Sequence, residues 1–165
     1  MFYLPALANF FSGDDWFHLR VTQIEGISQF LNFFSISPNA QTASFYRPLS
    51  TQVFFFVFQK FFGLVAWPYY LFGLFLFVYS IHLVYKFSNN KLAALIYGIS
   101  VSNFTRLYFL SAYQELFLVI FSLLTMINFK KRPYLPLFFF VLALLSKETA
   151  AMLPVLVLIL NFEYI

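Results

Sequence analysis

Residues 67–87 constrain the fold most strongly, because this segment is long and apolar enough to cross a lipid bilayer as a helix. It contains no acidic residue, and Lys86 lies near its end. Its first residues, Trp67-Pro68-Tyr69-Tyr70, are typical of the aromatic belt at a membrane interface. We therefore predict a transmembrane helix over residues 67–87.

The composition extends this prediction to the whole chain. Hydrophobic residues make up 62% of the 165 residues and charged residues 10%, whereas soluble domains are roughly 45–50% apolar. We expect an all-α, polytopic transmembrane helical bundle with interfacial helices in a long first outer loop. No basic run is long enough to follow a phosphate backbone, so no nucleic-acid partner is expected. The absence of cysteine excludes disulfides and thiolate metal sites.

Apolar runs and the polar residues between them divide the chain further. Residues 1–11 are expected to be the end of a first transmembrane helix, and 12–66 an outer loop with interfacial helices near 21–34 and 53–62. Further transmembrane helices are predicted at 67–87, 92–104, 112–129, 134–146 and 149–162. The last two span only about 20 Å each, so the turn between them should lie below the membrane surface.

The positively charged loops predict the orientation of these helices. Lys86 and Lys91 lie in one short loop. Lys130, Lys131 and Arg132 lie in another, and both loops are expected on the cytoplasmic side. The intervening segments then face the outer or luminal side. The polar residues predicted to share that side are Asp14, Asp15, Arg47, Arg106, Lys147 and Glu148.

The adjacent acids Asp14 and Asp15 follow an apolar segment in a chain that is otherwise poor in acid. The other acidic residues are Glu25, Glu115, Glu148 and Glu163. At a membrane surface, one carboxylate of the pair could act as a base, or both could hold a cation. The alternative is that the pair only ends a helix and keeps a loop in water.

Several short motifs, taken in order, resemble the C-type glycosyltransferases, and within them the protein O-mannosyltransferase-like branch. The motifs are the Asp14-Asp15 pair after an apolar segment, the long outer loop, Tyr46-Arg47-Pro48-Leu49, and Leu144-Leu145-Ser146-Lys147-Glu148-Thr149 before an apolar stretch. Such enzymes usually have more spans. The chain is similar to their N-terminal part, and we expect this part alone to be inactive.

The resemblance implies a polyprenyl-phosphate-linked sugar as donor and transfer at the outer face of the cytoplasmic membrane, or in the lumen of the endoplasmic reticulum. The acceptor can be a protein, a lipid or a glycan. By resemblance, Asp14 is the base that deprotonates the acceptor hydroxyl. Asp15 orients the acceptor or holds a divalent cation, although the second acid of the pair is commonly Glu in the mannosyltransferases.

The departing lipid phosphate is an anion that needs cationic partners. Arg47, Arg106 and Lys147 are the residues expected to bind it, with Glu148 beside them. Arg47 suits the task because its planar guanidinium can bind phosphate oxygens in a bidentate manner. The alternative role for Arg47 is an interfacial anchor that contacts lipid head groups.

Two more residues are further candidates for the site. His18 could join a metal site or share the base role. Glu115 begins a predicted helix and could pair with Arg106 as a structural contact. Two other classes of function stay open: a transporter or flippase in which Asp14, Arg47 and Glu148 line a polar path, and a structural membrane subunit whose polar loops contact a partner.

Overall fold

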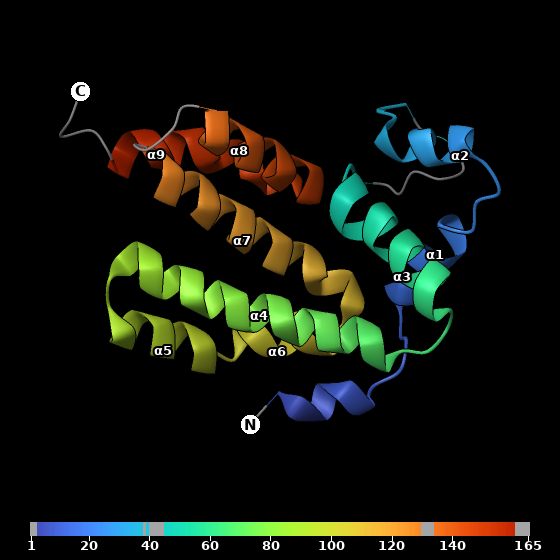
Figure 1. Cartoon of the computed structure of the whole chain (residues 1–165), viewed down its shortest axis with the longest axis horizontal. Coiled ribbons are helices and arrows are strands. Elements are labelled where there is room, and N and C mark those ends of the chain that lie inside the picture. Colours follow the sequence, from blue (N-terminus) through green and yellow to red (C-terminus); the bar gives the residue numbers. More distant parts are fainter. Residues whose placement is uncertain (1–2, 38, 40–44, 130–133, 161–165) are drawn as a thin grey trace.

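The computed structural model describes residues 3–37, 39, 45–129 and 134–160. These residues form helices and connecting turns, with no strand in the described part of the chain. The predicted all-α fold is therefore confirmed. Figure 1 shows the longer helices forming one body, with α1–α3 gathered at the end where α4 and α7 begin.

Four helices make up the main body: α4 (Trp67–Ser88), α5 (Lys91–Ile99), α7 (Tyr113–Asn128) and α8 (Tyr134–Ser146). Along this body α5 packs on α4, α4 on α7, and α7 on α8 (Figure 1). The basic residues Lys86 and Lys91 lie at the far end of α4 and the start of α5, away from α1–α3. Lys130, Lys131 and Arg132, which the orientation prediction also uses, lie outside the described residues.

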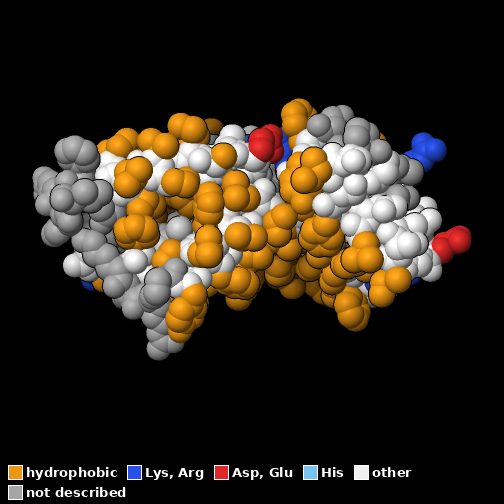
Figure 2. All heavy atoms as spheres, turned by 90° about the horizontal axis from the view of Figure 1, so that it is seen from above, with side chains coloured by type: hydrophobic (Ala, Val, Ile, Leu, Met, Phe, Trp, Pro, Cys, Tyr) orange, Lys and Arg blue, Asp and Glu red, His pale blue; other side chains and the backbone are white. Residues whose placement is uncertain are grey.

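Two helices are long and apolar enough to cross a membrane, by length and composition. They span Trp67–Ser88 and Leu110–Asn128, with 22 and 19 residues. Only 28% of the most apolar window of each is buried inside the molecule, whereas the core helix of a soluble protein is mostly buried. Figure 2 shows hydrophobic side chains over much of one face, with few charged ones among them.

The segment 92–104, predicted as one transmembrane helix, is broken in the structure. Helix α5 ends at Ile99, Ser100 is extended, and α6 (Ser102–Tyr108) follows. At the break the carbonyl of Tyr97 accepts the backbone N–H of Ser100 at 3.3 Å and a hydrogen bond from the side chain of the buried Asn103. An Asn side chain that satisfies the backbone locally competes with a continuous helix, and the hydrophobic run alone did not reveal this.

The N-terminal segment also differs from the prediction. Residues 3–11 contain the 3-10 helix η1 (Leu4–Ala8), which has Pro at its start, instead of the end of an α-helix. The acidic pair then begins α1 (Asp14–Val21) and does not lie in a loop. Acidic side chains suit this position because the helix dipole is positive at its N-terminus. The predicted interfacial helix at 21–34 is reduced to α2 (Ile27–Leu31) and the short 3-10 helix η2 (Asn32–Phe34).

The second part of the outer loop folds closer to expectation. A π-helical turn, η3 (Pro48–Val53), leads directly into α3 (Phe54–Phe62), near the predicted interfacial helix. At the C-terminal end, the 3-10 helix η5 (Glu148–Met152) precedes α9 (Leu153–Leu160) in the segment predicted as a helix over 149–162. The short 3-10 helix η4 (Leu110–Ala112) joins α6 to α7.

Aromatic rings form much of the core and hold the outer segment against the main body. The Phe54 ring of α3 lies 5.9 Å from Phe72 of α4 and 5.6 Å from Tyr113 of α7, between ring centroids. Two tyrosine hydroxyls of α4 donate to loop carbonyls: Tyr69 to Gly63 at 2.7 Å and Tyr70 to Phe10 at 3.0 Å. Such aromatic pairs add to the energy of apolar burial, and they fix α3 beside α4 and the start of α7.

Candidate functional site

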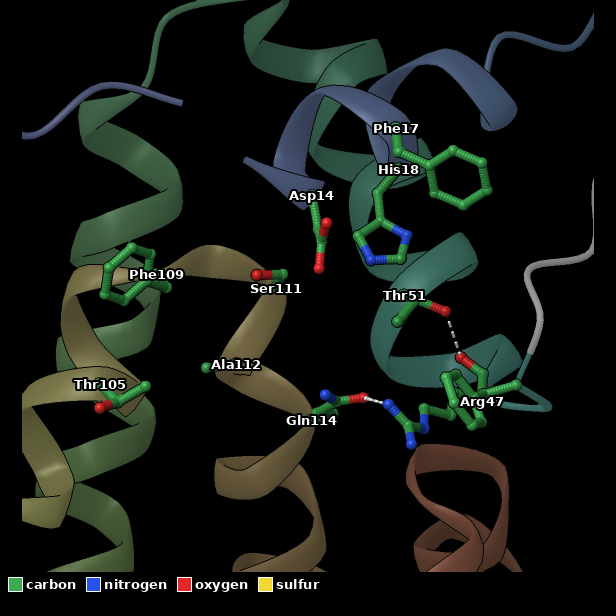
Figure 3. Close-up of a pocket in the computed structure, with 11 residues that line it drawn as sticks. Asp14, Phe17, His18, Arg47, Thr51, Thr105, Phe109, Ser111, Ala112 and Gln114 are labelled. Carbon is green, nitrogen blue, oxygen red and sulfur yellow. Dashed lines mark hydrogen bonds between the residues drawn. The ribbon is translucent and has the colours of Figure 1, made fainter. Parts of the chain in front are cut away.

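A cavity of about 540 Å³ lies where the outer segment meets the start of α7. Its volume falls within the range of small-molecule sites, about 300–1,000 Å³. Three stretches of chain form its walls: α1, residues 45–51, and the region from α6 to the start of α7 (Figure 3). The lining residues are Asp14, Phe17, His18, Phe45, Arg47, Thr51, Thr105, Phe109, Ser111, Ala112 and Gln114.

Asp14 and His18 reach this cavity from one face of α1. They are four residues apart, which places them one turn apart on the same side of a helix. Gly13, at the N-cap, has a φ of 51°, a conformation that side chains disfavour, and it lets the chain turn into α1. Figure 3 shows the Asp14 carboxylate and the His18 ring directed into the same space. Asp14 is exposed, so it is accessible to a ligand.

Asp15 lies elsewhere, although it was predicted to orient the acceptor or hold a cation. Its side chain is fully buried and does not line the cavity. Its two carboxylate oxygens accept backbone N–H groups, one from Ser12 at 3.1 Å and one from Ser111 at 2.8 Å. Burial raises the pKa of Asp15, and these hydrogen bonds oppose the rise. Asp15 therefore joins α1 to the start of α7, and both of its oxygens already accept hydrogen bonds.

Arg47 lies on another wall of the cavity, and the segment that follows it is joined to α8. The hydroxyl of Ser50 donates to the carbonyl of Ser146 at 2.6 Å, which joins η3 to the end of α8. The Arg47 guanidinium also lies 4.5 Å from the centroid of the Phe45 ring, a cation–π contact. The side chain is only 15% exposed, so its charge is partly shielded from water.

The guanidinium of Arg47 is paired within the protein. Its Nε donates to Glu148 Oε2 at 2.7 Å and its Nη2 to Glu148 Oε1, while Nη1 donates to Gln114 Oε1 at 2.6 Å. This pairing lowers the pKa of Glu148 to about 2. Arginine has five N–H donors, so two remain without a partner in the described part of the chain. Glu148 therefore holds Arg47 in place and is not itself in the cavity wall.

The other predicted phosphate-binding residues lie outside the cavity wall. Lys147 forms an ion pair with Glu115, so Glu115 pairs with Lys147 and not with Arg106 as expected. Arg106 donates to the side chain of Asn103 at 3.1 Å. Both contacts are structural. Of the cations predicted to bind the phosphate, the structure brings Arg47 into the cavity with Asp14.

His18 is 9% exposed and packs between aromatic rings. Its ring centroid lies 5.1 Å from that of Phe55 and 5.6 Å from that of Phe17. Its Nδ1 is buried with no hydrogen-bond partner among the described residues. Burial lowers the pKa of His18 to about 4, so the ring is neutral at pH 7; the nearby Asp14 charge opposes this shift and Arg47 adds to it.

Sequence reasoning missed most of the neutral lining of the cavity. Thr51 lies one helical turn after Arg47, and its hydroxyl donates to the Arg47 carbonyl at 2.6 Å. Ser111 and Gln114 lie on either side of Tyr113, the first residue of α7, and Gln114 directly precedes Glu115. No charge or motif marks these hydroxyl and amide groups. The only signal in the sequence was that Thr51 lies close to Arg47, and Ser111 and Gln114 close to Glu115.

Comparisons of the chain with protein-family models, with curated proteins and with solved structures found no match. Within the described residues, no group of three or more His, Cys, Asp or Glu side chains could hold a metal ion. The cavity itself is therefore the feature that points to a function.

Proposed function

We propose that this chain is part of a membrane glycosyltransferase, similar to the C-type enzymes, that moves a sugar from a polyprenyl-phosphate donor to an acceptor hydroxyl at the outer or luminal face. The observation that carries this proposal is the sharing of one cavity by the exposed carboxylate of Asp14 and the guanidinium of Arg47. A base and an anion-binding group in one cavity are what such a transfer requires.

The chemistry assigns a role to each of these groups. The acceptor hydroxyl gives its proton to the Asp14 carboxylate as its oxygen forms a bond to the anomeric carbon of the sugar. The bond from that carbon to the phosphate oxygen breaks, and the oxygen keeps the electron pair. The developing phosphate charge is stabilised by the two N–H groups of Arg47 that have no partner among the described residues. A single displacement of this kind inverts the anomeric configuration.

The arrangement of charges favours transfer over transport. Gln114 and Glu115 lie in the first turn of α7, and Lys147 and Glu148 directly follow α8. The ionisable residues Glu115, Lys147 and Glu148 therefore lie at one end of α7 and α8. A transport path instead requires ionisable residues midway along broken spans. The three aromatic rings in the lining, Phe17, Phe45 and Phe109, suit the apolar faces of a sugar and the start of a polyprenyl tail.

The test separates the two roles in the full-length protein reconstituted in nanodiscs. Transfer is assayed with undecaprenyl-phosphate mannose, glucose and galactose, and binding with undecaprenyl phosphate by native mass spectrometry. We expect Asp14→Asn to lower transfer at least about 100-fold, as loss of a general base does, without changing lipid-phosphate binding. Arg47→Gln should weaken that binding about tenfold or more.

Equal loss of binding in both variants would indicate a folding defect and would remove the separate roles. Undiminished transfer by Asp14→Asn would exclude Asp14 as the base. In proteoliposomes, saturable movement of undecaprenyl phosphate across the bilayer without transfer of the sugar would favour the flippase alternative.

A further inference from the structure

His18 is a polar residue in a place where an apolar ring would fit. It packs against the rings of Phe17 and Phe55, and its Nδ1 reaches neither solvent nor a hydrogen-bond partner among the described residues. An unpaired buried polar atom destabilises a fold, and native proteins keep few of them. Since Phe would fill the same space without this cost, folding alone does not explain a histidine here.

The surroundings of His18 point to a ligand. The ring lines the cavity beside Asp14, one helical turn along α1 (Figure 3). The charged groups that act on it are Asp14 and Arg47, and burial outweighs the effect of the carboxylate, so the ring stays neutral. A neutral imidazole carries one N–H. Because Nδ1 is buried without a partner among the described residues, we place the N–H on Nε2. Nε2 is then the nitrogen that can donate to a ligand in the cavity.

We propose that His18 binds the acceptor: its Nε2–H donates a hydrogen bond to the same hydroxyl oxygen that Asp14 deprotonates. This role rests on the proposed transferase function and deepens it. A hydroxyl has one proton and two lone pairs. The proton points to Asp14, one lone pair accepts from His18, and the second lone pair is left to attack the anomeric carbon. Two adjacent groups on one helix thereby fix the direction of attack.

A neutral donor suits this position better than a charged one. An imidazolium beside Asp14 would lower the basicity of the carboxylate through its charge. The buried neutral ring orients the hydroxyl without placing a positive charge beside the carboxylate. Asp14 and His18 then act as one acceptor-binding pair, while Arg47 serves the donor on another wall of the cavity.

The test uses two substitutions of His18 in the full-length protein. His18→Phe keeps an aromatic ring between Phe17 and Phe55 but removes both nitrogens. His18→Gln places an amide N–H at a reach similar to that of Nε2. Three quantities are measured for each variant: the melting temperature, the binding of undecaprenyl phosphate, and kcat for transfer from the undecaprenyl-phosphate sugar that the wild type uses.

We expect His18→Phe to melt at the same temperature as the wild type or higher, and to bind undecaprenyl phosphate equally well. Its kcat should fall about 10- to 100-fold, the size expected for lost orientation of a reacting group. His18→Gln should recover most of that loss. A lower melting temperature for His18→Phe with unchanged kcat would make the ring structural and overturn the proposal. Equal loss of kcat in both variants would overturn it too, whereas an inactive wild type would instead refute the transferase function itself.

Discussion

The contact between Gly73 of α4 and Tyr113 of α7 gives a sharp test of the packing that supports the cavity. A Cβ added at Gly73 would lie 2.0 Å from the Tyr113 hydroxyl oxygen and 2.1 Å from Cζ. The two helices would have to separate by roughly 1.4 Å to reach the 3.4 Å of ordinary contact. Tyr113 cannot easily turn away, because it is fully buried against Phe54.

We therefore expect Gly73→Ala to destabilise the protein by about 3 kcal/mol or more, at or above the upper end of the usual cost of overpacking. Alanine is the better helix former by about 1 kcal/mol, so this gain is too small to offset the clash. For a chain of this size, the loss corresponds to a fall in melting temperature of about 6–12 °C. Thermal unfolding in detergent micelles, followed by circular dichroism, measures it.

The matched control is Gly98→Ala in α5. Its added Cβ would meet only the flexible end of Ile81, at 3.2 Å, so we expect a change within about 1 kcal/mol. Two substitutions of Tyr113 test whether its ring causes the loss. Tyr113→Phe removes the hydroxyl but leaves Cζ in place, so it should not rescue Gly73→Ala, whereas Tyr113→Ala should make the two substitutions less than additive. A Gly73→Ala protein as stable as the wild type would refute this packing of α4 on α7.

Two further predictions concern charged groups near the cavity. Asp15→Ala should destabilise the fold by about 1–3 kcal/mol, because it leaves two partly buried backbone N–H groups, of Ser12 and Ser111, without their acceptor. Asp14→Ala, at the exposed neighbouring position, should stay within about 0.5 kcal/mol, and chemical denaturation compares the two. The pKa of Glu148, about 2 in the fold against an ordinary 4.5, predicts that its pairing with Arg47 stabilises the protein above pH 4.5 and that this contribution fades as the pH falls toward 2. The melting temperature should therefore drop more between pH 5 and pH 2 in the wild type than in Glu148→Gln, and parallel curves would contradict this pairing.

Hydrophobicity was enough to predict the helical fold and the long helices, because an apolar run of about 20 residues has few other ways to satisfy its backbone. The break at Ser100 was not predictable in this way, since it depends on one Asn103 side chain that bonds the backbone of the preceding turn. The start of α1 was missed for a similar reason. An acidic pair after Gly13 fits a loop and a helix N-terminus equally well when only the sequence is considered.

Within the candidate site, the sequence identified charged residues but not the contacts that each of them makes in the fold. The rarity of acidic residues marked Asp14, and the motif around Arg47 together with its planar guanidinium marked Arg47; both line the cavity. The same reasoning selected Lys147 and Arg106, which the fold uses for contacts with Glu115 and Asn103. A sequence shows which residues carry charge, but it does not show which partners the fold gives them.

The most direct test of the central claim asks whether the walls around Asp14 and Arg47 enclose one site for a lipid-linked phosphate. The chain has no cysteine, so single cysteines can be placed at Phe17 on α1, at Thr105 on α6, and at Ser88 at the far end of α4 as a control. Labelling with a maleimide is then measured at increasing concentrations of undecaprenyl phosphate. We predict that the lipid protects the Phe17 and Thr105 positions with the same half-saturating concentration, that Arg47→Gln raises this concentration about tenfold, and that the Ser88 position is labelled throughout. Protection of neither wall, or of both walls equally with and without Arg47, would contradict the account.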